Sequence, residues 1–185
     1  SDIENSKCLL VFGYNCADSH PIVARRVIKA RENGAKNIVC DPRRPDMKEL
    51  LNRKIKRRES FRPFAPSVLE ERTGEWFTIA YPDPFMLKVY PIRPERRPQV
   101  PAVTHVDGTG RLQTVSERSN PRYWRLIAAF ARETGVPMVL NTSFNDKGEP
   151  IVCTPGDALS FFVKSQIDYL AMGPFLAKNP ATADA

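Results

Sequence analysis

The sequence is poor in the residues that usually bind metal ions. It has four cysteines and two histidines among 185 residues. The cysteines form no C-x-x-C pair and have no group of histidines beside them: Cys8, Cys16, Cys40 and Cys153. This spacing argues against a zinc site and favours free thiols in a reducing cytoplasm.

Long apolar runs and a secretory signal are also absent. A stretch such as residues 151–163 is too short and too polar to cross a bilayer. Residues 1–7 lack the basic-then-apolar order of a signal peptide, so we expect a cytoplasmic protein. Hydrophobic residues make up 42% of the chain and charged residues 26%, which is typical of a globular domain and not of a disordered chain.

Positive charge is in excess. Lys and Arg total 28 against 21 for Asp and Glu, which gives a formal charge of +7. Such a balance favours an anionic partner: a phosphorylated small molecule, a nucleic acid or an acidic membrane. Among these residues only the charge itself supports nucleic acid, so we expect RNA or DNA binding to be unlikely, and we expect no membrane partner.

The hydrophobic patterning predicts that the chain has two structural parts. Residues 8–12 and 37–40 read as strands around a helix that starts at Pro21, a short β-α-β unit within residues 1–44. The remainder predicts a mixed α/β or α+β open sheet in residues 45–178, with a tail at 179–185. We expect helices at 47–55, 68–76, 121–134 and 155–163, and strands at 84–89, 103–106, 111–115, 138–140, 151–153 and 167–172.

A basic segment precedes a rigid turn. Residues 46–62 hold seven Lys/Arg, among them Lys56, against three acids, and prolines then prevent a helix. Arg62 stands between Phe61 and Phe64, and burying an unpaired charge there would cost several kcal/mol. A phosphate or carboxylate ligand would satisfy its planar donors. The alternative is an ordinary solvated helix face.

Polar residues follow the strand expected at 138–140. Open sheets place ligands beyond the carboxyl ends of such strands, where Asn141 and Ser143 fall. No G-x-S-x-G elbow surrounds Ser143 and neither histidine is linked to it in sequence, so both residues read as hydrogen-bond donors to an anion. An ordinary loop remains the alternative. His105 fits a structural role, and Arg111 opens the strand after the turn at 107–110.

Five phrases in a fixed order carry a family resemblance. They are DPRRPDMK (41–48), RESFRPFAPSV (58–68), PAVTHVDGT (101–109), NTSFN (141–145) and GEPIV (148–152). From about residue 41 to 178 the chain closely resembles the C-terminal domain of the carbamoyltransferases that modify antibiotics and nodulation factors. That resemblance implies a YrdC-like twisted sheet that binds carbamoyl phosphate and ATP, with Mg²⁺, and forms carbamoyl adenylate.

The resemblance also implies site residues. Lys56 and Arg62 would hold phosphate groups as catalytic residues, Arg111 would add a cation, and Asn141 and Ser143 would hydrogen-bond the phosphate or nucleotide. Arg31 coincides with the arginine of a family phrase of the type R-A-L-G-x-R-S-I and is a further candidate for binding. The family's actin/Hsp70-like domain, which transfers the carbamoyl group, has no counterpart in this sequence and would be the missing partner.

Residues 1–44 resemble a segment of molybdopterin-dependent formate dehydrogenases, through residues 11–15, 17–24, 33–36 and 38–43. In that family the segment helps to bind the dinucleotide of the cofactor. The iron–sulfur cysteines have no counterpart here, so we expect no functional molybdopterin or iron–sulfur cluster. The sequence therefore predicts a chimera whose carbamoyltransferase part performs adenylation. The alternative is an inactive chimeric or structural domain that only binds nucleotide or phosphate.

Overall fold

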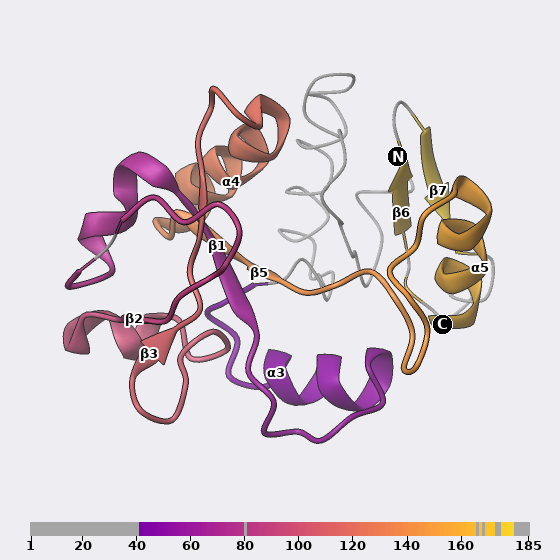
Figure 1. Cartoon of the computed structure of the whole chain (residues 1–185), viewed down its shortest axis with the longest axis horizontal. Coiled ribbons are helices and arrows are strands. Elements are labelled where there is room, and N and C mark those ends of the chain that lie inside the picture. The colour runs from indigo at the N-terminus through magenta and orange to yellow at the C-terminus, as the bar shows by residue number, and fades with distance from the viewer. Residues whose placement is uncertain (1–40, 80, 166, 168, 173–174, 180–185) are drawn as a thin grey trace.

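A computed structural model describes residues 41–79, 81–165, 167, 169–172 and 175–179 (Figure 1). The β-α-β unit expected before residue 41 lies outside the described residues. So do Arg31 and most of the predicted tail.

The central element is a three-stranded mixed sheet in the order β4-β1-β5, formed by Gln113–Val115, Ala65–Leu69 and Met138–Asn141. β1 runs parallel to β4 and antiparallel to β5, so that Val68 pairs with Thr114 on one side and with Met138 on the other. A sheet with both parallel and antiparallel strand pairs, packed against helices, confirms the predicted mixed α+β class.

The two faces of this sheet bury different clusters, because side chains alternate along a strand. Leu69, Val115 and Val139 pack with Ile127 of α4 (Pro121–Thr134). Val68 and Leu140 belong to the larger core, which extends to the helix that begins at Met47 and to α5 (Pro155–Ser165). Every residue of β1 is buried, so the sheet is the rigid base from which the flanking loops emerge.

Helix α4, Pro121–Thr134, has the bounds that the sequence predicts. Asn120 caps it by accepting a hydrogen bond from the backbone N–H of Tyr123, and Pro121 occupies the first turn. Gly135 ends it with a φ of 76°, a left-handed conformation that glycine adopts without strain.

The predicted helix at 47–55 is also present, but its geometry changes from α-helical to π-helical. α3, Met47–Leu50, continues into a π-helical segment, η1, Leu51–Ile55. Met47, Leu51 and Ile55 are buried on its inner side. The wider π turn is frequent at functional sites.

The smaller elements surround this frame. They are the 3-10 helices η2 (Glu70–Glu75) and η3 (Pro94–Gln99), the pair β2 (Tyr90–Pro91) and β3 (Thr109–Gly110), α5 (Pro155–Ser165), and the pair β6 (Tyr169–Met172) and β7 (Phe175–Lys178). Figure 1 shows α5, β6 and β7 set apart from the central sheet and joined to it by the chain that follows β5. No helix among the described residues is long and apolar enough to span a membrane.

Three predicted strands are wrong: 84–89, 103–106 and 151–153 form none. In the first, the buried carboxylate of Asp83 accepts the backbone N–H groups of Leu87 and Lys88, which shapes a loop. In the second, the N–H of Val103 bonds to the carbonyl of Val100 in a turn. The helix predicted at 68–76 is confined to η2, because residues 68 and 69 belong to β1.

Candidate functional site

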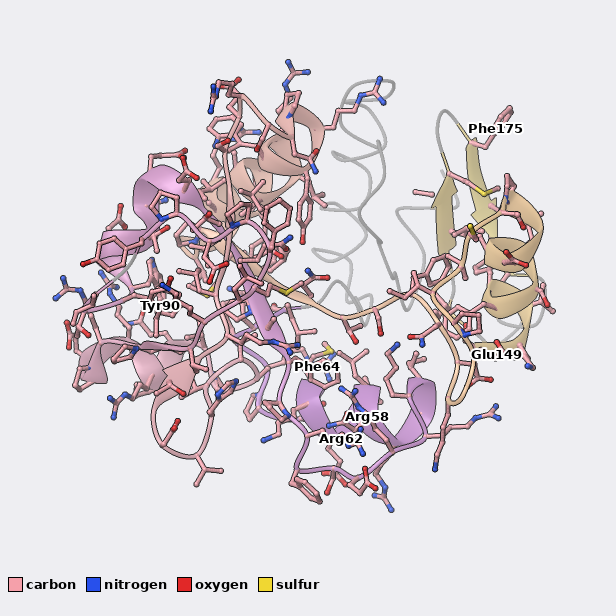
Figure 2. The ribbon with its side chains drawn as sticks, viewed as in Figure 1. Arg58, Arg62, Phe64, Tyr90, Glu149 and Phe175 are labelled. Carbon is pink, nitrogen blue, oxygen red and sulfur yellow. The ribbon has the colours of Figure 1, made fainter. Side chains whose placement is uncertain are left out.

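A hollow of about 190 Å³ opens between the end of η1 and the loop after β5. Its lining comes from two segments that are far apart in sequence: Lys56, Arg58, Glu59 and Arg62, and Ser143, Asn145, Asp146, Lys147 and Gly148. Figure 2 shows Arg58 and Arg62 close together beside the helix that Figure 1 labels α3, with Phe64 above them. The lining carries four cations and two carboxylates, so the hollow has a net positive charge.

Lys56 joins the two segments. Its side chain is buried, and Nζ donates to Ser143 Oγ at 3.1 Å, to Asn145 Oδ1 at 2.8 Å and to the carbonyl of Asn145 at 3.0 Å, with a further contact to the carbonyl of Ser143. Burial, reinforced by the charge of Arg58, lowers the pKa of Lys56 to about 8. A buried ammonium thus lies at the base of the hollow and fixes the loop that follows β5.

Arg58 lies beside Lys56 with its guanidinium held on two sides. Nε donates to Asn52 Oδ1 at 2.7 Å, and Cζ stands 4.9 Å from the centre of the Phe64 ring. Burial and the charge of Arg62 lower the pKa of Arg58, against the attraction of Glu59, and Arg111 adds to this repulsion. Such crowding of cations is relieved by an anion.

Arg62 lines the hollow but not for the reason that the sequence suggested. Phe61 is 72% exposed and only Phe64 is buried, so the expectation of a buried arginine between two buried aromatics is wrong. The side chain of Arg62 is 53% exposed and its Nε bonds to Glu59 Oε2 at 2.8 Å. A backbone hydrogen bond and the charge of Arg62 lower the pKa of Glu59, which keeps this carboxylate ionised.

The loop after β5, which faces Lys56, is also held by a contact with α5. Lys164 of α5 donates to Glu149 Oε1 at 2.8 Å and lies 3.7 Å from Asp146 Oδ2. Asn145 Nδ2 donates to the carbonyl of Glu149 at 2.8 Å, and Ser143 Oγ donates to Asn145 Oδ1 at 2.7 Å. The oxygen and amide groups that face Lys56 are therefore held in place from both sides.

The structure brings three of the predicted site residues to the hollow: Lys56, Arg62 and Ser143. Asn141 does not line it, because its Nδ2 donates to Gln113 Oε1 at 2.8 Å beside the sheet. Arg111 is exposed and does not line it either, although its charge acts on Arg58.

Sequence reasoning missed Arg58, Asn145, Asp146 and Lys147. A usable signal was the spacing: Arg58 follows Lys56 by two residues, and Asn145 follows Ser143 by two. The first pair lies in the basic segment at 46–62, and the second lies in the polar loop after the strand at 138–140. Only the fold shows that the two pairs face each other.

The donors suit an oxyanion better than a metal ion. No group of three or more His, Cys, Asp or Glu side chains that could hold a metal is found among the residues that the structure describes. Ammonium, guanidinium, hydroxyl and amide groups together match the acceptor oxygens of a phosphate or carboxylate. Fold and hollow thus define an α+β protein with a compact, positively charged hollow.

The sequence comparisons place this protein in a family. The family model described as "Carbamoyltransferase C-terminus" matches residues 24–179, and the chain belongs to that family. The match begins inside residues 1–44, which we predicted to be a separate unit. The resemblance of that segment to formate dehydrogenases gains no support from these comparisons and stays a prediction.

Several relatives are nodulation proteins. The chain is 47% identical over 158 residues to nodulation protein NolO of Bradyrhizobium diazoefficiens, which covers 82% of this chain and 28% of that protein. It is 48% identical over 154 residues to nodulation protein NolNO of Sinorhizobium fredii, with 80% and 22% covered. An uncharacterised protein of Synechocystis sp. is 43% identical over 171 residues, with 82% and 28% covered. The chain therefore spans under a third of the length of these relatives.

Proposed function

We propose that the hollow binds the phosphorylated end of carbamoyl phosphate and the phosphate groups of ATP. Membership of the family and the net positive charge of the lining support this proposal. At about 190 Å³ the hollow is smaller than the roughly 300–1,000 Å³ typical of sites for drug-sized ligands. It therefore suits a phosphate-bearing group, while the rest of a nucleotide would extend beyond it.

The proposed reaction is formation of carbamoyl adenylate. Carbamoyl phosphate gives its phosphoryl group to water as inorganic phosphate, and the carbamate oxygen attacks the α-phosphorus of ATP and displaces pyrophosphate. Both steps develop negative charge on phosphate oxygens, which fixed cations stabilise. Arg58 and Arg62 would hold these oxygens, and Lys56 would add its charge beside them. Ser143 and Asn145 bond to the Lys56 ammonium and would keep it in place.

Mg²⁺ belongs to this proposal as a companion of ATP. The two carboxylates of the hollow, Glu59 and Asp146, are too few to form a cage of their own. Mg²⁺ in nucleotide sites commonly keeps several waters and binds one or two carboxylates together with the phosphates, which fits this lining. The ion would neutralise part of the triphosphate charge.

One observation carries the proposal: Lys56, Arg58 and Arg62 share a hollow with Ser143 and Asn145, although 87 residues separate Lys56 from Ser143. The experiment is pyrophosphate release from ATP with and without carbamoyl phosphate, together with calorimetric titration of each ligand. We expect release only when both substrates are present and its loss in Lys56→Met. Lys54→Met is the matched control, because Lys54 is exposed on the same helix and does not line the hollow.

A second candidate is a module that binds these ligands without turnover. It is favoured by the bonding of Lys56, whose ammonium already donates to acceptors on Ser143 and Asn145 and so acts first as a structural group. Saturable binding of carbamoyl phosphate without pyrophosphate release would support this candidate. Absence of binding by either ligand would refute both.

A further inference from the structure

Asn52 is a polar residue in an apolar position. It lies in η1 next to Leu51 and is fully buried, with no exposed surface. Its neighbours on the inner side of the helix, Met47 and Ile55, belong to the hydrophobic core. A buried carboxamide is costly unless its hydrogen bonds are made, so the partners of Asn52 show what the residue does.

The Asn52 side chain makes three hydrogen bonds, and all of them go to one short segment, residues 58–62. Nδ2 donates to the carbonyl of Ser60 at 3.1 Å and to the carbonyl of Arg62 at 2.9 Å. Oδ1 accepts from Arg58 Nε at 2.7 Å. A single side chain thus fixes the backbone of the turn that lines the hollow and one edge of the arginine within it.

Backbone hydrogen bonds around Asn52 also bring Arg58 close to it. The N–H of Lys56 bonds to the carbonyl of Leu51 at 2.8 Å, and the N–H of Arg58 bonds to the carbonyl of Asn52 at 2.9 Å. Arg57, with a φ of 47°, turns the chain between them. The π turn and this left-handed residue together bring Arg58 back over Asn52.

Within the described part of the chain, this arrangement uses Nε of Arg58 and leaves its two terminal nitrogens available. Nε is occupied by Asn52, and the Phe64 ring lies 4.9 Å from Cζ, so the plane of the group has a support. Among the described residues, no hydrogen-bond acceptor is recorded for Nη1 or Nη2 of Arg58, which lines the hollow. The pair of terminal nitrogens is the part that bonds two phosphate oxygens in parallel.

We propose that Asn52 is a positioning residue that orients Arg58 as a two-pronged phosphate ligand. It does not touch the ligand and acts only through the guanidinium and the turn that carries it. The inference rests on the proposed function, because it takes the hollow to be the phosphate site. Pre-orientation of a long side chain raises affinity, since less rotational freedom is lost on binding.

The test is calorimetric titration of carbamoyl phosphate into the full chain with Asn52→Ala, Arg58→Ala and the double variant. We expect about a tenfold or greater loss of affinity in Asn52→Ala. Adding Asn52→Ala to Arg58→Ala should cost little more, because the group through which Asn52 acts is already gone. A folded Asn52→Ala variant that binds within twofold of the wild type, or the same loss in both backgrounds, would overturn the inference.

The matched control is Asn179→Ala. Asn179 is also a fully buried asparagine, and its Nδ2 donates to the carbonyl of Phe162 at 3.0 Å, but it does not line the hollow. We expect this variant to lose stability without losing affinity. Equal losses of affinity in both asparagine variants would mean that Asn52 only supports the fold.

A measurement without ligand separates this inference from the proposed function. The Arg58 Nε–H signal in a ¹⁵N NMR spectrum should be protected from solvent exchange in the wild type and unprotected in Asn52→Ala. If that change occurs while the wild type fails to bind carbamoyl phosphate, the orientation of Arg58 is right and the assignment of the hollow is wrong. An Nε–H that stays protected in Asn52→Ala refutes the inference itself.

Arg58→Lys makes the same test where Asn52→Ala does not fold. Lysine keeps the positive charge but has neither the Nε–H that Asn52 accepts nor the fork. Its affinity for carbamoyl phosphate should fall close to that of Arg58→Ala. Affinity near that of the wild type would show that charge alone suffices and that orientation by Asn52 is irrelevant.

Discussion

Two arginine-rich stretches of this protein have similar composition and different tasks. Residues 56–62 and residues 93–97 each contain three arginines. In the first stretch, Arg58 and Arg62 line a hollow together with Lys56. In the second, Arg93 and Arg97 bond to backbone carbonyls and Arg96 lies over an aromatic ring, and none of the three lines the hollow.

The second stretch shows how arginine serves as a structural residue. Arg93 Nε donates to the carbonyl of Gly74 at 3.0 Å, and Arg97 Nε donates to the carbonyl of Ile92 at 3.0 Å. Arg96 lies with Cζ 4.8 Å from the ring of the buried Trp76. These contacts attach η3 to the C-terminal end of η2 and to Ile92, the residue that follows β2.

The difference teaches that an excess of positive charge does not locate a binding site. What distinguishes the two stretches is where their side chains lie, since Arg58 is bonded through Nε within the protein just as Arg93 and Arg97 are. Arg58 and Arg62 of the first stretch line the hollow, where guanidinium nitrogens can meet the oxygens of a ligand.

The largest effect is expected from Arg58→Ala. Loss of its charged hydrogen bonds should weaken binding of carbamoyl phosphate by about 10–100-fold in calorimetry. Arg96→Ala should leave affinity within twofold and instead reduce the free energy of unfolding by about 0.5–1 kcal/mol, because it removes the contact with Trp76. Equal losses of affinity in the two variants would erase the distinction between the stretches.

A smaller effect is expected from pH, through Lys56. Because burial lowers its pKa to about 8, raising the pH from 7 to 9 removes its charge and should weaken binding by up to about tenfold. The free energy of unfolding should instead rise with pH. Between pH 8 and 10.5 the unfolded chain binds more protons at Lys56 than the folded chain does, so burial of this lysine costs less as the pH rises.

Calorimetry and urea unfolding over this pH range measure the two trends. Lys56→Met is the control and should flatten both of them. A variant that keeps the wild-type pH dependence would show that another group titrates.

The smallest effect is expected from Glu59→Gln. Glu59 pairs with Arg62 at 2.8 Å in the hollow, and removing this competing carboxylate should tighten phosphate binding by less than about fivefold, since exposed pairs are worth about 0.2–1 kcal/mol. Glu75→Gln is the control, because Glu75 forms the same kind of exposed pair with Arg72 at 2.7 Å outside the hollow. Titration should show no change for Glu75→Gln, and tightening in both variants would indicate a general effect of net charge.

Much of the frame followed from local pattern. Helix α4 has its cap, its proline and its terminal glycine in sequence, so its bounds are those predicted. The strands that failed as predictions had suitable composition, but Asp83 and nearby turns took up their N–H groups. Strand pairing depends on a distant partner, which composition does not supply. The YrdC-like assignment remains a prediction.

The sequence by itself determined the family, the mixed class of the fold and the basic character of the segment that lines the hollow, because these follow from motifs, hydrophobic period and charge. Only the tertiary structure decided which cations share a hollow. Contact between Lys56 and the loop at Ser143 spans 87 residues, and the orientation of Arg58 depends on the buried Asn52. Such contacts arise when the core closes, since packing and hydrogen-bond satisfaction, and not proximity along the chain, select the partner of each charged group.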